Sequence, residues 1–307
     1  MQLKENVNVS VIVTTYNRSK LLLETIRSII NQTFSNIELI IVDDGSTDDT
    51  EEVIKSVSDP RIEYIKIKNW GGPARPRNIG IKKAKGKFLA FCDDDDLWMT
   101  DKLETQLKHF EDSSIVGVGS STLLFGNLRY YKQKLYNNNL ELGFLDLLNI
   151  GTLALSSLVV RKIDNFFFDE SRHLLFIEDF EFQLRLLNKT GKKFKLLADP
   201  LIYYRIHHNS SAIGIRNNLV SVVDKYRKDI PEKMYREVES KINFNFGINY
   251  LRKNDPERAK TYFHRAFVKS KMKYKIKAMI GLVLSFSPFF IRDKLMVLYY
   301  GTLNRNL

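Results

Sequence analysis

Residues 9–17, VSVIVTTYN, form a run of β-branched apolar residues that ends in Thr, Tyr and Asn. A run of this kind predicts a buried strand with polar side chains at its carboxyl end. Residues 18–34, RSKLLLETIRSIINQTF, carry their apolar side chains at helical spacing. A buried strand that leads directly into an amphipathic helix is the repeating unit of an α/β fold.

The same unit recurs further along the chain. Residues 37–57, IELIIVDDGSTDDTEEVIKSV, read as a buried strand, a polar turn and a helix, and residues 61–92 contain two more strands around a helix. This alternation predicts a mostly parallel sheet flanked by helices. Beyond about residue 112 the pattern is less regular, and we expect a second half with mixed strand directions. From residue 215 onward the chain reads as α-helical, with one hairpin that resembles a tetratricopeptide unit.

Composition narrows the class of protein. The chain has 307 residues, 44% of them hydrophobic, which is enough to bury a large core. A single cysteine, Cys92, excludes a disulfide framework and a zinc site built from cysteines. The N-terminus lacks the basic and long apolar regions of a secretory signal, so we expect the protein in the cytoplasm.

Charge divides the chain in two. The formal net charge is +12, yet residues 1–214 contain 28 basic and 28 acidic residues, while residues 215–307 contain 20 and 8. We therefore expect a ligand-binding domain at 1–214 and a basic helical region at 215–307. Only the net charge favours a non-enzymatic nucleic-acid-binding role. Because the first domain is electrically balanced, we expect no nucleic-acid partner.

Polar side chains follow three of the predicted strands. They lie at residues 14–17, 43–46 and 93–96, the last being an unbroken run of four aspartates. The carboxyl ends of parallel strands share one edge of a sheet, so these segments should converge on a ligand crevice. In extended conformation Asp93 and Asp95 would point to one side and Asp94 and Asp96 to the other. Carboxylates this close favour a bound Mg²⁺ or Mn²⁺, although one of them could merely cap the next helix.

Four further groups are candidates, each with a structural alternative. Asp43 and Asp44 could accept hydrogen bonds from a nucleotide base or ribose, or could belong only to a turn. Arg75 and Arg77 lie near a predicted helix start, which suits a diphosphate, but surface arginines are common. In FIEDFEF, residues 176–182, Glu178 and Asp179 could supply a general base, or simply favour the helix dipole. His207 and His208 follow a strand and could add a metal ligand or stay solvated.

Taken together, four blocks resemble the inverting family 2 glycosyltransferases with the GT-A fold. The blocks are VSVIVTTYNR (9–18), IIVDDGSTDDT (40–50), ARPRNIGIKKAKGKFLAFCDDDDLW (74–98) and IEDFEF (177–182), and the match runs over roughly residues 7–212. Any one block is weak, whereas their order and spacing as a set are specific.

The resemblance implies a role for each matching residue. Thr14, Tyr16 and Arg18 would line the nucleotide pocket, with Asp44 and Asp43 binding the base. Arg77 would lie near the phosphates, although the extra Pro-Arg in ARPRN leaves Arg75 as an alternative. Asp93 and Asp95 match the D-x-D element and would bind the metal, Asp95 directly, and Asp94 takes part if the register shifts by one. His207, from the residue pattern above, completes the expected set of metal ligands. Asp179 matches the catalytic base.

The implied reaction is the transfer of a hexosyl or N-acetylhexosaminyl group from a nucleotide-diphospho-sugar, most commonly a UDP-sugar, to a hydroxyl of a glycan or lipid-linked acceptor. The implied cofactor is Mn²⁺ or Mg²⁺, and the implied process is cell-surface polysaccharide synthesis. A sugar-nucleotide nucleotidyltransferase is the alternative enzyme. Such an enzyme usually carries a glycine-rich basic signature near its first strand, and TTYNRSK at residues 14–20 does not resemble one.

The tail combines basic and apolar residues. Lys269–Lys277 form a basic cluster, and the apolar run from Ala278 to Ile291 is about 14 residues long and contains Pro288. A spanning helix needs about 20 residues, so we expect peripheral contact with an anionic membrane, on the inner face of the cell membrane. The alternative is a helical subdomain that packs its own core.

Overall fold

The computed structural model describes residues 7–128, 135–207, 219–269, 272–288 and 294–295. Contacts divide the chain into two compact units, one of Met1–Asn127 with Gln133–His207 and the other of Leu128–Lys132 with His208–Leu307. The boundary expected at residue 214 lies outside the described residues, as does His208.

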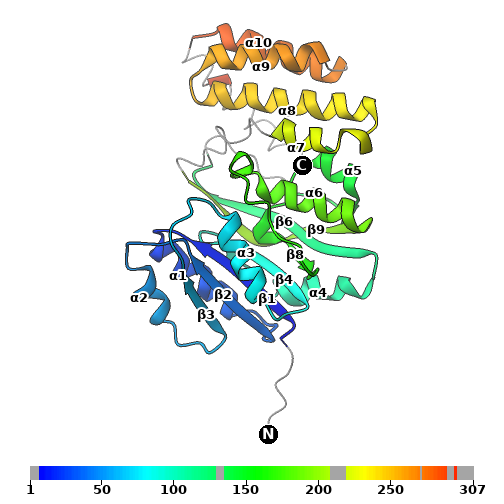
Figure 1. Cartoon of the computed structure of the whole chain (residues 1–307). Helices are drawn as coiled ribbons and strands as arrows, with labels where there is room; N and C mark the ends of the chain where they lie inside the picture. The colour runs from blue at the N-terminus through cyan, green and yellow to red at the C-terminus, as the bar shows by residue number, and fades with distance from the viewer. Residues whose placement is uncertain (1–6, 129–134, 208–218, 270–271, 289–293, 296–307) are drawn as a thin grey trace. The chain divides into compact units, whose positions relative to one another are not determined.

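The first half of unit 1 is the parallel sheet that the sequence predicts (Figure 1). Its strands are β1 (Val9–Thr15), β2 (Ile37–Asp43), β3 (Ile62–Lys66) and β4 (Phe88–Asp93), paired in the order β3-β2-β1-β4. Helices α1 (Ser19–Ile30), α2 (Thr50–Lys55) and α3 (Ala74–Lys83) connect them. Thr15 pairs with Asp43, and Thr14 pairs with Asp93. The carboxyl ends of β1, β2 and β4 therefore meet at one edge.

The second half of unit 1 is mixed, as expected. It contains β5 (Leu97–Trp98), β6 (Ile115–Gly126), β7 (Leu140–Leu142), β8 (Val159–Arg161) and β9 (Lys193–Ile206), with helices α4 (Lys102–Leu107), α5 (Phe144–Ile150) and α6 (Glu178–Thr190). β8 runs antiparallel to both β4 and β6, whereas β6 and β9 are parallel. The α/β fold class, with helices around a central sheet, is thus confirmed.

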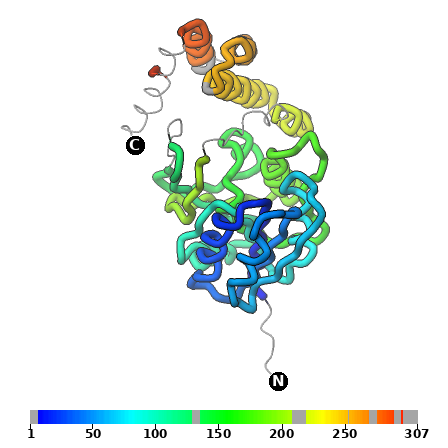
Figure 2. Tube along the Cα trace, turned by 90° about the vertical axis from the view of Figure 1, so that its left-hand side faces the viewer, coloured from blue at the N-terminus to red at the C-terminus, as the bar shows by residue number. Residues whose placement is uncertain are grey.

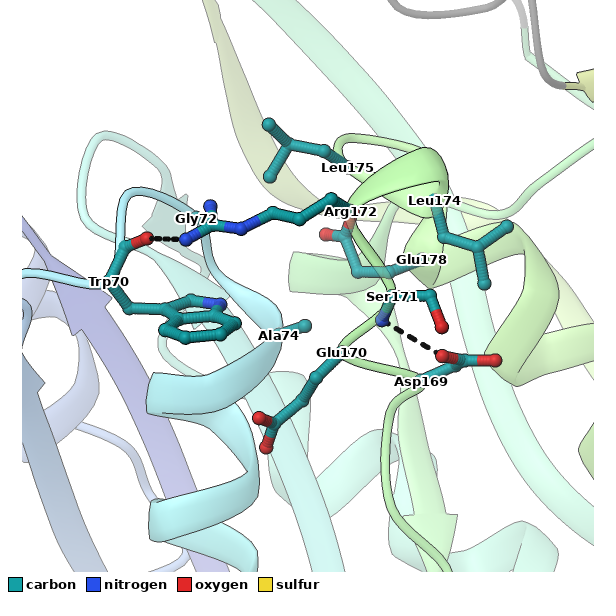
Figure 3. Close-up of a pocket in the computed structure, with 10 residues that line it drawn as sticks. All are labelled: Trp70, Gly72, Ala74, Asp169, Glu170, Ser171, Arg172, Leu174, Leu175 and Glu178. Carbon is teal, nitrogen blue, oxygen red and sulfur yellow. Dashed lines mark hydrogen bonds between the residues drawn. The ribbon is translucent and has the colours of Figure 1, made fainter.

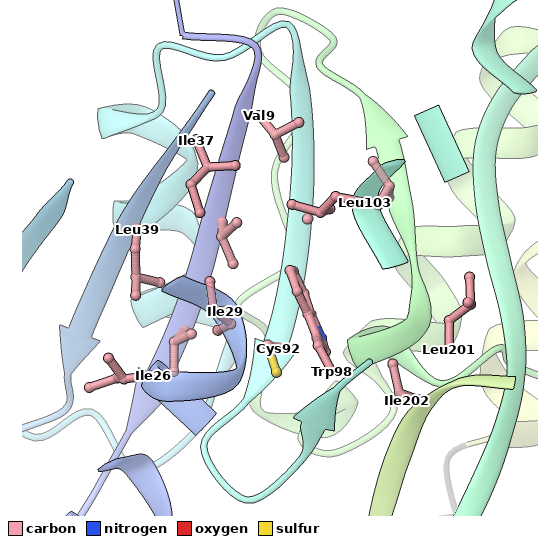
Figure 4. Close-up of a cluster of buried hydrophobic side chains, with 14 of the residues drawn as sticks. Val9, Ile26, Ile29, Ile37, Leu39, Cys92, Trp98, Leu103, Leu201 and Ile202 are labelled. Carbon is pink, nitrogen blue, oxygen red and sulfur yellow. The ribbon is translucent and has the colours of Figure 1, made fainter. Parts of the chain in front are cut away.

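The main core fills the space between the sheet and α1 (Figure 4). Leu22, Ile26 and Ile29 are fully buried, and their spacing of three and four residues places them on one face of α1. They join a cluster that includes Val9, Leu39, Cys92 and Trp98. Since every residue of β2 is buried, the strand occupies the interior of the sheet, in agreement with its continuous apolar sequence.

Unit 2 is helical in its described part. Its helices are α7 (Leu219–Lys225), α8 (Glu232–Arg252), α9 (Pro256–Lys269) and α10 (Met272–Phe286), and α9 and α10 lie side by side (Figure 2). Phe263 of α9 is fully buried, and a Cβ added at Gly247 of α8 or Gly281 of α10 would lie 2.5 or 2.4 Å from its ring. Two glycines thus let three helices approach one aromatic ring. The part of the tail up to Phe286 does pack a core of its own.

Among the helices of the described ranges, none combines the length and apolarity that crossing a bilayer requires.

Gly281→Ala should lower the free energy of unfolding of unit 2 by about 1–3 kcal/mol, because the new methyl group has no room beside Phe263. This loss should occur although alanine is the better helix former. Urea titration followed by circular dichroism measures it. A Phe263→Leu/Gly281→Ala double variant should lose less than the sum of the single variants. Additive losses would show that the ring and the glycine do not interact.

Candidate active site

Three polar segments meet at the carboxyl edge of the parallel strands, as expected. Thr15 Oγ1 donates a 2.8 Å hydrogen bond to Asp94 Oδ2, and the Asp44 N–H donates to the Thr15 carbonyl at 2.9 Å. The Asn17 N–H donates to Ser46 Oγ at 2.9 Å. The end of β1 therefore contacts both the turn after β2 and the aspartate run after β4.

The aspartate run is not extended as expected, although burial still separates Asp94 and Asp96 from Asp93 and Asp95. β4 ends at Asp93, and the Asp96 N–H donates to the Asp93 carbonyl at 3.2 Å, which closes a turn. Asp94 Oδ1 and Asp95 Oδ2 both accept hydrogen bonds from Arg18 Nη1, at 2.9 and 2.8 Å. One guanidinium thus draws together two neighbouring carboxylates that an extended strand would point to opposite sides.

Two of the four aspartates are buried in the fold. Asp94 is 5% exposed and accepts hydrogen bonds from Thr15 and Arg18. Burial raises its pKa to about 6, and the positive charge of Arg18 opposes this rise. Asp96 is fully buried, accepts the Arg205 N–H at 2.9 Å, and burial raises its pKa well above the usual value. Burial of this kind leaves Asp93 and Asp95 as the more accessible members of the run.

Asp95 and His207 lie together, although 112 residues separate them in the sequence. Nε2 of His207 is 2.8 Å from Asp95 Oδ2, and Arg205 Nε donates to the Asp95 carbonyl at 2.9 Å. Arg205 belongs to β9, and His207 directly follows the last residue of that strand, Ile206. A carboxylate oxygen and an imidazole nitrogen at this spacing are suitable donors for Mn²⁺ or Mg²⁺, which commonly complete their coordination with phosphate oxygens and water.

Asp93 is the third member of the expected metal set, but Arg77 contacts it. Arg77 Nη2 donates to Asp93 Oδ1 at 2.8 Å, and the Asp93 side chain is 36% exposed. Within the residues that the structure describes, no three His, Cys, Asp or Glu side chains are arranged to hold a metal by themselves. Asp95 and His207 supply two neighbouring donors, so an ion bound here would take its other ligands from a bound phosphate or from water.

Arg77 is buried and bridges two carboxylates. Its Nη1 donates to Glu178 Oε1 at 2.6 Å, and its Nη2 donates to Asp93. Arg75 has different partners: its Cζ lies 3.3 Å from the centre of the Trp70 ring, and its Nε donates to Glu170 Oε2 at 2.8 Å. Of the two candidate arginines, Arg77 is the one that contacts the aspartate run.

Asp179 lies in the first turn of α6. Its Oδ1 accepts the Phe180 N–H at 2.7 Å, and Thr152 Oγ1 is 3.5 Å from Oδ2. Burial, together with the adjacent Glu178, raises the pKa of Asp179 to about 7. A carboxylate with a pKa near neutrality is suited to accept a proton during catalysis. The helix-dipole explanation accounts for the position of Asp179 but not for this raised pKa.

Asp43 and Asp44 hold the loops around the site. Asp43 accepts the Ser46 N–H at 2.7 Å and the Tyr64 hydroxyl at 2.8 Å. Asp44 accepts the N–H groups of Trp70 and Gly71 at 2.7 and 2.9 Å. All four carboxylate oxygens thus have a protein donor, and contact with a base would use their remaining lone pairs. The predicted base-binding role stays a prediction.

The two remaining candidates, Thr14 and Tyr16, lie at the end of β1. Thr14 is half-buried between β2 and β4, whereas Tyr16 is 47% exposed. Asn17 adopts a left-handed conformation with φ of 53°, and its Oδ1 accepts the Thr47 N–H at 2.7 Å. This turn directs the chain into α1 and leaves the Tyr16 ring accessible to a ligand.

A small pocket borders the site on the side of Glu178 (Figure 3). Trp70, Arg172 and Glu178 are among its lining residues, and Arg172 Nη2 donates to the Trp70 carbonyl. Glu178 Oε2 is buried, and no donor from the described parts of the chain reaches it. Sequence reasoning missed Trp70 and Arg172. The signal for Trp70 was an aromatic residue directly before two glycines, whereas Arg172 stands 102 residues away and gave none.

Comparison with known proteins identifies similar sequences and folds. The model of the family described as glycosyl transferase family 2 matches residues 10–163. The Escherichia coli protein UDP-Glc:alpha-D-GlcNAc-diphosphoundecaprenol beta-1,3-glucosyltransferase WfaP is 33% identical over 213 residues, 66% of this chain and 78% of that protein. An uncharacterized glycosyltransferase of Rickettsia bellii is 47% identical over 116 residues, 38% of this chain. The chain spans less than a fifth of the length of the Rickettsia relatives that it matches, 17% and 19%.

Solved structures with low sequence identity share the fold. S. aureus TarS 1–349 in complex with UDP-GlcNAc has a TM-score of 0.63 at 19% identity, covering 97% of this chain and 90% of that one. The mannosyltransferase PcManGT of Pyrobaculum calidifontis, in complex with GDP-Man and Mn²⁺, has a TM-score of 0.60 at 17% identity, covering 99% and 88%. The fold is GT-A, and the family match covers half of the sequence: the chain belongs to glycosyltransferase family 2.

Proposed function

We propose that the protein transfers a sugar from a nucleotide-diphospho-sugar to an acceptor hydroxyl, with inversion at the anomeric carbon. One observation carries the proposal: His207 and Arg18 converge on Asp95 within the aspartate run, while Arg77 links Asp93, the first residue of the run, to Glu178, the neighbour of Asp179. A cation-binding pair and a carboxylate of raised pKa thus belong to one connected site.

Asp179 acts as the general base in this proposal. It takes the proton from the acceptor hydroxyl as that oxygen attacks the anomeric carbon, and the nucleoside diphosphate leaves from the opposite face. One displacement inverts the configuration, so no covalent nucleophile is needed. Asp95 and His207 would hold a divalent metal, Mn²⁺ or Mg²⁺, together with oxygens of the bound diphosphate. Asp93, the third expected ligand, would join them on release from Arg77. The metal would stabilise the charge of the diphosphate leaving group.

The remaining candidates bind the donor. Thr14 and Tyr16 line the nucleotide pocket, and Asp43 and Asp44 contact the base. Arg18 and Arg77 act on the diphosphate side, where their guanidinium groups balance carboxylates and phosphates together. We infer a UDP-linked hexose or N-acetylhexosamine as donor. The relative WfaP, which is named for UDP-Glc as its donor, supports this choice.

The acceptor that fits best is a glycan carried on a lipid diphosphate. WfaP is named for a diphosphoundecaprenol-linked acceptor, and another relative, TuaG of Bacillus subtilis, is named as a putative teichuronic acid biosynthesis glycosyltransferase. We therefore infer that the protein acts in cell-surface polysaccharide synthesis, from the cytoplasm, at the inner face of the cell membrane. The division into a transferase domain, 1–214, and a basic helical region, 215–307, is part of the same proposal.

Asp95→Ala should reduce nucleoside diphosphate release from the preferred donor by at least about a hundredfold, since it removes a ligand of the proposed metal. The assay uses a panel of UDP-, GDP- and dTDP-sugars with Mn²⁺. Asp96→Asn is the matched control from the same run: asparagine keeps the acceptor for the Arg205 N–H, and release should stay near wild type. Formation of a nucleoside triphosphate and a sugar 1-phosphate when inorganic pyrophosphate is added to the same donors would favour the nucleotidyltransferase, and equal release with EDTA would contradict the metal site.

Asp179→Asn should lower kcat by about 10²–10⁴-fold and leave the affinity for the nucleotide nearly unchanged, because only proton transfer is lost. In the wild type the base must be ionised, and its pKa is raised to about 7. The value of kcat should therefore increase as the pH rises through about 7, and should decrease as the pH falls below that value. A pH profile of kcat tests this. If the variant keeps the wild-type kcat, or if the acidic limb of the profile survives in it, Asp179 is not the base.

A further inference from the structure

Helix α10 carries an exposed apolar stripe. Its members are Ile276, Met279, Ile280, Val283 and Phe286, which are 49% to 72% exposed. At 100° per residue, this spacing places all of them within one face of the helix. The opposite face packs inward, with Ala278 fully buried and Gly281 against Phe263. Exposed apolar residues scattered singly need no explanation, but a continuous stripe marks an interaction surface.

Basic residues border the stripe. Lys275 and Lys277 stand one residue before and one after Ile276, so they flank the stripe on its two sides. Lys275 Nζ lies 5.7 Å from the ring of Phe267, and Phe267 and Val268 extend the exposed apolar surface at the end of α9. The sequence of α10, MKYKIKAMIGLVLSF, contains no acidic residue. The surface is therefore apolar along its centre and positive at its margins.

This pattern matches an anionic lipid surface. A helix that lies in the membrane interface buries its apolar face at the acyl boundary, while flanking lysines extend toward the headgroups. Each lysine near an anionic bilayer adds attraction. At 15 residues, α10 is also shorter than a spanning helix. One face of α10 thus packs in the core of unit 2, and the exposed apolar face remains accessible to a membrane surface.

We infer that the stripe Ile276–Phe286 of α10, with Lys275 and Lys277, binds the surface of an anionic membrane. This inference rests on the proposed function, because a lipid-linked acceptor is presented at such a surface. It goes further in assigning membrane contact to one face of one helix rather than to the apolar run as a whole.

Vesicle flotation of the full chain, without nucleotide, tests the inference. Wild type should bind phosphatidylcholine vesicles with about 30% phosphatidylglycerol more tightly than pure phosphatidylcholine vesicles, and the difference should shrink with salt. Met279→Gln/Ile280→Gln/Val283→Gln should weaken binding to the anionic vesicles by at least about tenfold. Lys275→Gln/Lys277→Gln should weaken it by about tenfold and leave binding to the neutral vesicles unchanged.

Two controls match these variants. Leu145→Gln changes an exposed leucine of α5, and Lys228→Gln/Lys253→Gln removes two exposed lysines outside α10; both should bind vesicles as wild type does. Nucleoside diphosphate release from a soluble donor, measured in parallel, should persist in the α10 variants, which separates failure of this inference from failure of the proposed function. Wild-type binding by the triple variant would overturn the inference. So would light scattering that shows an oligomer which the triple variant dissociates, because a second copy would then cover the stripe.

Discussion

The site depends on the pair of hydrogen bonds that the buried guanidinium of Arg77 donates to two carboxylates. It is 6% exposed and donates to Asp93 at the end of β4 and to Glu178 at the start of α6. Three elements, α3, β4 and α6, are thereby joined by one charge. Removing it would leave Glu178 buried without a counter-charge, a loss typically worth about 3–5 kcal/mol. Because Asp179 follows Glu178 directly, the same contact also fixes where the raised-pKa carboxylate lies.

A second guanidinium contacts the two middle residues of the aspartate run. Arg18 Nη1 donates to both Asp94 and Asp95, and His207, the residue after β9, lies beside Asp95. Close carboxylates repel one another unless cations offset the repulsion. The positive charges of Arg18 and Arg77 balance these carboxylates within the protein, so the four aspartates can form a tight turn at the edge of the sheet. The four aspartates consequently differ: Asp94 and Asp96 are buried, while Asp93 and Asp95 remain more accessible.

Local sequence patterns were sufficient for much of the fold. The apolar runs of β1 and β2 and the helical spacing of Leu22, Ile26 and Ile29 predicted the parallel half and its core, and the carboxyl-edge rule brought residues 14–17, 43–46 and 93–96 together. The turn at Asp94 was not predictable, since it depends on Arg18 and on β9. The partners Arg77 and Glu178 lie 101 residues apart, and no local spacing encodes such a pair. For α10, the apolar run was visible in the sequence, but its division into a packed face and an exposed face required the position of Phe263.

The central claim is that the aspartate turn, with His207, binds a nucleoside diphosphate through a divalent metal. Isothermal titration of UDP, GDP and dTDP into the protein, with Mn²⁺ and with EDTA, measures this directly. At least one of these nucleotides should bind at least about tenfold more tightly with Mn²⁺ than with EDTA, and Asp95→Ala should remove the difference. Equal affinity in both conditions, or a metal effect that survives in Asp95→Ala, would contradict it.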